Sequence, residues 1–407
     1  MKLEKSSNPV ARWFQAIGPG LITAALVFGP SKLTITSKLG ALYGYDLLWI
    51  VIVAIFFMAV FTAMATRVGA TIPDSFLQTV RKKWGKPVSI VVGICVFLVS
   101  TSFQAGNSIG VGIALGELSG TSPAPWVIGC TAVAVSLLFF RKFYSILEKT
   151  MIALILLMLF SFITTFVLAK PDPVKMVKGF TMPSLPDGSL GLVIAFTASC
   201  FSIVGALYQS YLIQERIRSN PALKDAKNDS LTGTLLLGVM SAVVIVCAAA
   251  VLNPQGLTVN SGSDMAKALE PIFGHNAATL FLVGLFGAAF SSQIGNASVG
   301  GTLLSDALGF GSSFGSRSVR LMTALVMVVG ACVALAFGKL PLELIVFAQS
   351  VTIFVVPIIG IAMYVIANDR EIMGARANSS FTRIAGLAGL VLIISLALVN
   401  INELFLK

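Results

Sequence analysis

Leu-Ile-Thr-Ala-Ala-Leu-Val-Phe-Gly-Pro-Ser-Lys-Leu-Thr, at residues 21–34, is the stretch of sequence that decides the fold. It lies in the middle of an apolar segment, 15–43, that is long enough to cross a bilayer. Pro30 has no N–H and disfavours helix at Gly29, so the sequence predicts a helix that breaks at membrane depth. Broken backbone is tolerated there only where it lines a cavity inside the protein. The stretch therefore predicts a membrane protein with its site at this break.

The rest of the chain has the composition of a membrane protein. Of 407 residues, 56% are hydrophobic and 11% are charged, and the mean hydropathy is +0.92. The share of apolar residues is larger than the core of a water-soluble protein of this length can bury. We expect an all-α protein with 11 transmembrane helices. Its apolar segments lie at 15–43, 46–66, 88–115, 124–140, 145–169, 189–213, 231–252, 277–307, 318–337, 342–366 and 382–402.

Several classes of function are excluded by what the sequence lacks. The net charge is +11, and the basic residues cluster in loops on alternate sides of the membrane, as topology signals do. They form no basic patch interleaved with aromatic residues, so nucleic acid is not expected as a partner. The one histidine, His275, falls in an expected outer loop, and no acid pair or Ser/His pair is buried. An intramembrane enzyme is therefore not expected, and neither is a resident cofactor. The cysteines are interpreted as small buried hydrophobic residues: Cys95, Cys130, Cys200, Cys247 and Cys332.

A second break is predicted in the segment at 189–213. Its middle, from Thr197 to Ala206, is small and polar at the corresponding depth, although such residues also permit close helix packing. Breaks five helices apart are typical of two inverted five-helix repeats with a site at their interface. We expect one transporter domain over 1–407. Helices 1–5 lie within 15–169, helices 6–10 within 189–366 and an eleventh helix at 382–402, so that 1–213 holds the first repeat and the start of the second.

Local motifs resemble the NRAMP family of divalent-metal transporters. The resemblance covers nearly the whole chain in topology and about half of it in local motif. It implies a LeuT-type fold that works by alternating access, with helices 1 and 6 unwound around the substrate. The matching stretches are Gly18-Pro19-Gly20-Leu21, Gly29-Pro30, Gly44 to Trp49, Gly110 to Leu115, Leu212 to Arg216, Ser291-Ser292, and Gln349 with Pro357.

The residues that the family uses for metal and protons are replaced. The resemblance aligns the family's Asp-Pro-Gly-Asn with Gly29-Pro30-Ser31-Lys32 and its Met-Pro-His with Ser202-Ile203-Val204. The acidic pair of helix 3 aligns with Gln104 and Asn107, and a later histidine with Gln209. A helix 10 glutamine aligns with Val355. The sequence therefore predicts no transition-metal site and no proton relay through the core.

Lys32 suggests a substrate of opposite charge. A lysine near the midplane costs about 2.5–3.5 kcal/mol on insertion scales, and an anion is its natural partner. We expect a small anion, bicarbonate first, with nitrate, formate and chloride left open. The alternatives are a divalent cation such as hydrated Mg²⁺, a tethered cation in an inactive relative, and a sensor or scaffold that does not transport. The expected substrate site comprises Gly29, Pro30, Ser31, Lys32, Ser199, Ser202, Gly205 and Ala206.

Import of an anion against a negative-inside potential needs a driving ion, and the sequence predicts sodium. Sodium commonly lies between helices 1 and 8 in LeuT-type folds, and the expected donors here are Phe28, Gly29, Ser291 and Ser292. Gln293 and Asn296 lie one turn away, and helix packing is the alternative explanation of the serines. The expected setting is the lipid bilayer of a prokaryotic inner membrane, with the chain a monomer, its N-terminus cytoplasmic and its C-terminus outside.

Overall fold

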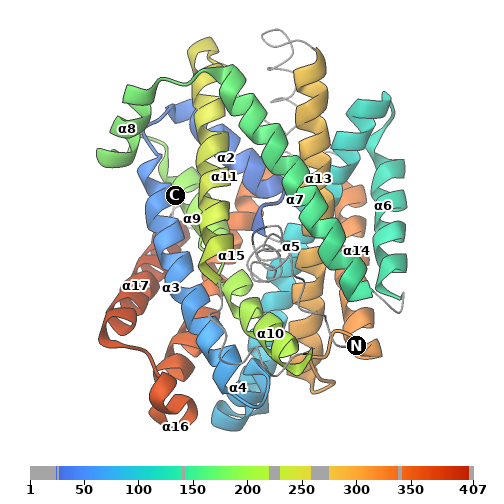
Figure 1. Ribbon diagram of the computed structural model, residues 1–407, viewed down its shortest axis with the longest axis vertical. Coiled ribbons are helices and arrows are strands. Elements are labelled where there is room, and N and C mark those ends of the chain that lie inside the picture. Colours follow the sequence, from blue (N-terminus) through green and yellow to red (C-terminus); the bar gives the residue numbers. More distant parts are fainter. Residues whose placement is uncertain are drawn as a thin grey trace, which may run out of the picture.

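The computed structural model describes residues 24, 27–139, 143–219, 230–257, 275–337 and 342–402, and every regular element in these ranges is a helix (Figure 1). The helices of the first half are α2 (Pro30–Tyr43), α3 (Trp49–Thr71), α4 (Phe76–Trp84), α5 (Lys86–Ser119), α6 (Pro123–Leu138), α7 (Phe143–Ala169) and α8 (Pro173–Thr181). The second half holds α9 (Leu190–Cys200), α10 (Ile203–Ser219), α11 (Ser230–Val251), α13 (His275–Leu308), α14 (Arg317–Phe337), α15 (Leu342–Asn368), α16 (Arg370–Met373) and α17 (Ser380–Ile401). Two 3₁₀ turns are η2 (Asn253–Gln255) and η3 (Gly374–Arg376).

Each apolar segment of the sequence coincides with a helix or a broken pair of helices, except that the first half of the segment at 15–43 lies mostly outside the described residues. Seven helices of the described part are long and apolar enough to cross a membrane, or eight if a bent pair counts as one span. The number 11 therefore stays a prediction. Sequence analysis missed α4, α8 and α16 and placed them in loops. It also placed His275 in a loop, whereas this residue begins α13.

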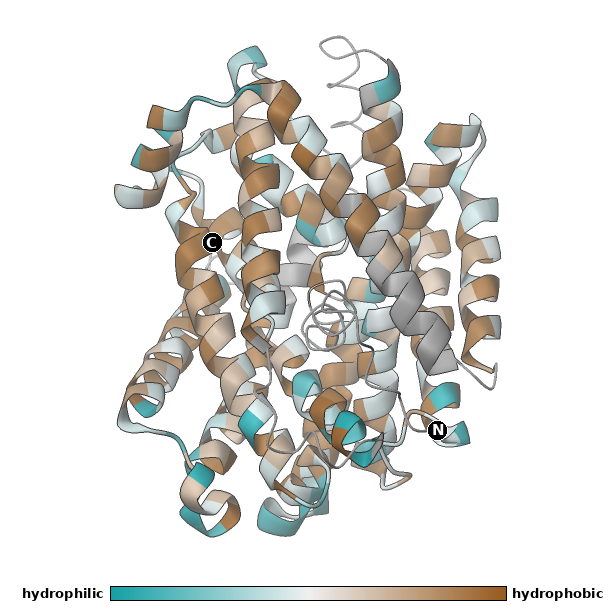
Figure 2. Ribbon diagram, viewed as in Figure 1, coloured by the Kyte–Doolittle hydropathy of each residue, from teal (hydrophilic) through white to brown (hydrophobic). Residues whose placement is uncertain are grey.

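The outer surface of the bundle is apolar, as contact with lipid requires. Ile52, Phe160, Val167, Ile384 and Leu398 each expose at least half of their surface. Figure 2 shows such hydrophobic residues along the helices, while hydrophilic residues gather at the ends of the bundle. Large exposed apolar faces are unfavourable in water and favourable in hydrocarbon. The chain is thus a multi-pass membrane protein.

Two helices of 34 residues, α5 and α13, pack against each other along their length and against α14. A Cβ built on Gly93 would lie 2.2 Å from Cβ of Ala307, so only glycine permits this approach of α5 to α13. The shorter helix α2 packs mainly on α11, and α10 packs mainly on α3. This arrangement places the start of α2 beside the middle of α5 and α13.

Candidate functional site

The first predicted break is present at Gly29. Helix α2 begins at Pro30, and Gly29 is extended with φ −99° and ψ −179°. The N–H of Gly29 donates to the carbonyl oxygen of Val27 at 3.1 Å, a tight turn that a continuous α-helix does not contain. Pro30 suits the first helical position because its missing N–H is not needed there. The local sequence thus explains why the helix begins here.

The second predicted break separates α9 from α10. Phe201 has φ −81° and ψ 61°, and its carbonyl oxygen accepts from the N–H of Ile203 at 2.9 Å. Ser202 Oγ then accepts from the N–H of Gly205 at 3.1 Å, which caps the start of α10. A Cβ on Gly205 would lie 3.0 Å from Ser202 Oγ and 3.1 Å from the side chain of Val27. The two breaks therefore lie side by side.

Oxygen atoms from two other helices converge on Gly29. A Cβ built on this glycine would lie 2.5 Å from Asn107 Oδ1 of α5 and 3.1 Å from Ser292 Oγ of α13. Asn107 is 2% exposed and Ser292 is 1% exposed. An amide oxygen and a hydroxyl thus fill the space where a side chain at position 29 would begin. These neutral oxygen donors suit a hard cation more than an anion.

Lys32 lies on a different side of the break. Its side chain is 1% exposed, and Nζ stands 4.9 Å from the centroid of the Phe196 ring of α9. The Cys200 thiol is near enough to interact with Nζ electrostatically, but Nζ has no hydrogen-bond partner among the described residues. The last turn of α9 carries the negative end of that helix dipole, which favours a cation. The amine of Lys32 therefore lies against the C-terminal half of α9.

The other predicted site residues are distributed around the two breaks. Ser31 Oγ lies against Gly106, where an added Cβ would be 2.2 Å away. Ser199 Oγ donates to the carbonyl oxygen of Phe196 at 2.9 Å and is thereby occupied within its own helix. Ala206 is fully buried in α10. Pro30 also lies against α5, since a Cβ added to Gly110 would be 2.2 Å from Pro30 Cγ, so Pro30 and Ser31 both face that helix.

The predicted polar core and sodium donors are only partly assembled. Gln104 is fully buried and neither amide atom has a hydrogen-bond partner in the described part of the chain. Gln209, in α10, is 1% exposed. Ser291 Oγ turns back to donate to the carbonyl oxygen of Ala288 at 3.2 Å. Ser292 Oγ therefore lies against Gly29, as predicted for a sodium donor, whereas Ser291 Oγ is hydrogen-bonded to the backbone of its own helix.

Sequence analysis missed three residues. It took Cys200 as a small hydrophobic residue, and it gave no role to Asp306 or Tyr211, which are both buried. An aspartate inside an apolar segment was an available signal, because intramembrane carboxylates are rare and need partners. The contact of Cys200 with Lys32 had no such signal. No group of three or more His, Cys, Asp or Glu that could hold a metal occurs in the ranges the structure describes.

Comparison with known proteins identifies relatives over nearly the whole length. Residues 20–403 match the family model described as "Natural resistance-associated macrophage protein-like". A protein of Chromohalobacter salexigens named "Divalent metal cation transporter MntH" is 25% identical over 404 residues, which cover 97% of this chain and 91% of that protein.

Solved structures show the same fold. The manganese transporter of Eremococcus coleocola, in complex with an aromatic bis-isothiourea substituted compound, has a TM-score of 0.73 at 19% identity, covering 97% of this chain and 88% of that chain. The nucleobase-cation-symport-1 family transporter MHP1 has a TM-score of 0.62 at 16% identity, covering 96% and 94%. The predicted all-α, LeuT-type membrane fold is thereby confirmed.

The prediction of a small anion such as bicarbonate is wrong by this comparison, because the relatives are named divalent metal cation transporters. The physical reason lies in the position of two groups. The prediction assumed that Lys32 points into a pocket lined by hydroxyls, whereas its amine lies against Phe196 and Cys200. The atoms that meet Gly29 are an amide oxygen of Asn107 and the hydroxyl oxygen of Ser292, and the amide oxygen can only accept, so it does not favour an anion.

Proposed function

Because this chain belongs to the natural resistance-associated macrophage protein family, we propose that it is a secondary transporter that carries a divalent metal cation across a bacterial inner membrane. The breaks at Gly29 and at Phe201-Ser202 support alternating access around a central site. The names of the relatives support a divalent cation as cargo. The proposed bacterial inner membrane rests on the bacterial relatives, and the proposed cytoplasmic N-terminus on the distribution of basic residues.

The observation that carries the proposal is the convergence of Asn107 Oδ1 and Ser292 Oγ on Gly29. Amide and hydroxyl oxygens bind hard cations, and Mg²⁺ retains several of its waters when a site supplies few protein ligands. A site without carboxylates or soft sulfur at this position cannot offset the full dehydration of a transition-metal ion. We therefore propose a partly hydrated cation, Mg²⁺ first and Mn²⁺ second.

Lys32 has a specific place in this proposal. Its amine lies at the end of α9, where the helix dipole would otherwise help to hold the cargo cation. A nearby ammonium group repels a divalent ion by several kcal/mol at an effective dielectric of about 20. The site is accordingly expected to bind its cation weakly and to release it readily.

The coupling ion stays a prediction. Of the expected sodium donors Phe28, Gly29, Ser291 and Ser292, the contact of Ser292 Oγ with Gly29 supports such a site, and Ser291 Oγ donates to the carbonyl oxygen of Ala288. Gln104 and Asn107 have no proton to exchange at ordinary pH, so a proton relay along this part of α5 is not expected. A sodium gradient is therefore the driving force to test first.

Uptake into proteoliposomes tests the cargo. We expect Mg²⁺ or Mn²⁺ to enter, as measured with an indicator trapped inside, and labelled bicarbonate to stay outside. Parallel runs with and without an inward sodium gradient measure coupling. Entry of bicarbonate without either cation would contradict the proposal, and entry of none of the three would favour the sensor or scaffold alternative.

Asn107→Ala is expected to raise the cation concentration for half-maximal uptake by about tenfold, because it removes one of the few protein oxygens at Gly29. Concentration series in the same liposomes measure this value. Asn253→Ala is the matched control, because Asn253 Nδ2 donates to the carbonyl oxygen of Ala41 at the end of α2, away from the break. Equal effects of the two variants would contradict a role of Asn107 as a ligand.

A further inference from the structure

A buried carboxylate joins three elements at the end of the bundle that carries α4. Asp306, in the last turn of α13, is 1% exposed. Ser75 Oγ donates to Asp306 Oδ1 at 2.8 Å, and Tyr211 Oη donates to Asp306 Oδ2 at 2.6 Å. The C-terminal end of a helix disfavours negative charge, so this carboxylate depends on its hydrogen-bond donors, of which Ser75 and Tyr211 are the shortest contacts.

The three residues come from parts of the bundle that otherwise pack on different partners. Helix α13 packs mainly on α5, whereas α10, which carries Tyr211, packs mainly on α3. Ser75 is the N-cap of α4, in the connection between α3 and α5. The hydrogen bonds to Asp306 therefore fasten α10 and the α3–α4 connection to α13.

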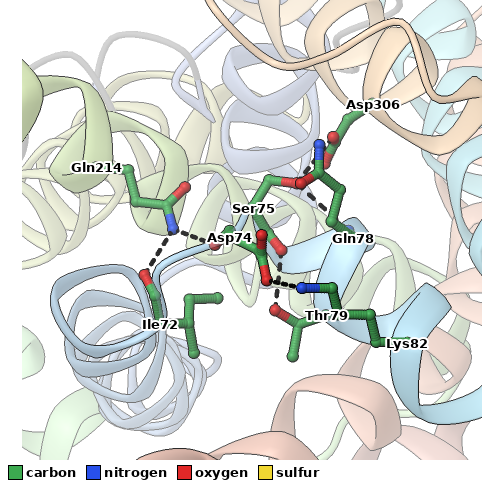
Figure 3. Close-up of polar contacts among 8 residues, drawn as sticks. All are labelled: Ile72, Asp74, Ser75, Gln78, Thr79, Lys82, Gln214 and Asp306. Atoms are coloured by element: carbon green, nitrogen blue, oxygen red, sulfur yellow. Dashed lines mark hydrogen bonds and ion pairs between the residues drawn. The ribbon is translucent and has the colours of Figure 1, made fainter.

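A second set of contacts strengthens the same junction. Gln214 of α10 donates through Nε2 to the carbonyl oxygens of Ile72 at 3.3 Å and Asp74 at 2.6 Å. Figure 3 shows Gln214 on one side of the α3–α4 connection, and Asp306 beyond Ser75 on the other. Tyr211 Oη also accepts from the N–H of Leu77 at 3.2 Å. The junction is thus a connected network.

The position of the network relative to the central site gives it a role. Tyr211 lies about 13 Å along α10 from the break at Ser202, given the rise of about 1.5 Å per residue. Tyr208, Tyr211 and Leu212 are each at most 4% exposed, so this stretch of α10 is closed to solvent. Any route from the break to this end of the protein along α10 and α13 must pass the network.

We propose that Asp306, Tyr211 and Ser75 form a latch that holds this route closed and that must open once in each transport cycle. The latch rests on alternating access, as does the proposed function, but it does not depend on which ion is carried. Separation of α10 from α13 would break the bond between Tyr211 and Asp306 and leave a buried carboxylate short of one donor. The open state is costly for that reason, until water reaches the carboxylate.

Cys200 provides a native reporter for the test. It is fully buried at the end of α9, next to the break, and is expected to react with a water-soluble maleimide only when a route opens. The reporter protein is the full chain with four of its five cysteines replaced by alanine: Cys95, Cys130, Cys247 and Cys332. Its alkylation rate in detergent is measured without any transported ion, so a failure of cation uptake leaves this test intact.

Tyr211→Phe and Ser75→Ala are each expected to raise the alkylation rate of Cys200 by about tenfold, since each removes one hydrogen bond to a carboxylate. Ser305→Ala is the matched control, because Ser305 Oγ of the same helix donates to the nearby carbonyl oxygen of Gly311 at 2.8 Å and not to Asp306. Its rate should equal that of the parent.

The latch is overturned if Tyr211→Phe and Ser75→Ala react at the parent rate, or if Ser305→Ala reacts as fast as they do. Melting temperatures of the purified variants identify any that unfold. If Ser75→Ala weakens the cap of α4 and unfolds, Tyr211→Phe decides the question alone, because it keeps the aromatic ring and loses only the hydroxyl.

Discussion

Lys32→Met is expected to lower the Mg²⁺ concentration for half-maximal uptake by about tenfold or more. The amine of Lys32 has no hydrogen-bond partner among the described residues and lies 4.9 Å from the Phe196 ring centroid, at the end of α9. Methionine has a similar length and fills the same space without a charge. Replacing Lys32 by methionine removes the repulsion between the amine and the cargo cation, and the negative end of the α9 dipole can then favour that cation.

The same substitution is expected to raise the melting temperature in detergent, because a buried amine without a partner is destabilising. Lys38→Met is the matched control, since Lys38 belongs to the same helix and is only partly buried. Concentration series for Mg²⁺ uptake measure both variants. Loss of uptake in Lys32→Met, with Lys38→Met unchanged, would contradict the proposed cargo and show that the amine is required for transport.

Gly29→Ala is expected to reduce cation uptake by about tenfold or more and to lower stability by about 1–3 kcal/mol, the usual cost of overpacking. The added methyl group would lie 2.5 Å from Asn107 Oδ1 and 3.1 Å from Ser292 Oγ, so it would push apart the two oxygens that are proposed to bind the cation. The backbone at Gly29 is in the extended region, which alanine adopts without strain. Crowding alone would therefore cause the effect.

Gly191→Ala is the control for this substitution. Gly191 is in α9, and a Cβ added there meets nothing within 4 Å. Uptake and melting temperature should match the parent in this variant, and both should fall in Gly29→Ala. If the two variants behave alike, the oxygens of Asn107 and Ser292 do not form the site. The double variant Gly29→Ala with Asn107→Ala separates the two cases. The proposal predicts that it is more stable than Gly29→Ala alone but takes up no more cation. If Asn107 is not part of the site, the double variant should behave as Gly29→Ala does.

Much of the architecture follows from the sequence by itself. The composition and the lengths of the apolar segments determine a helical membrane protein, because hydrocarbon leaves the backbone no other partners than its own. The Gly29-Pro30 pair determines where α2 begins, because proline lacks the donor that a continuous helix needs. The small residues around Ser202 indicated the second break. These are local effects, and local sequence contains them.

The substrate site and the latch were decided by the tertiary structure. Asn107 and Ser292 are far from Gly29 in sequence, and only the position of the start of α2 beside α5 and α13 brings their oxygens to it. The packing of α2 on α9 places Lys32 beside Phe196 and not in the hydroxyl-lined pocket that the sequence analysis expected. Tyr211 meets Asp306 because α10 and α13 come together there. Hydropathy and helix propensity specify segments, whereas the direction of each side chain depends on which helices pack together.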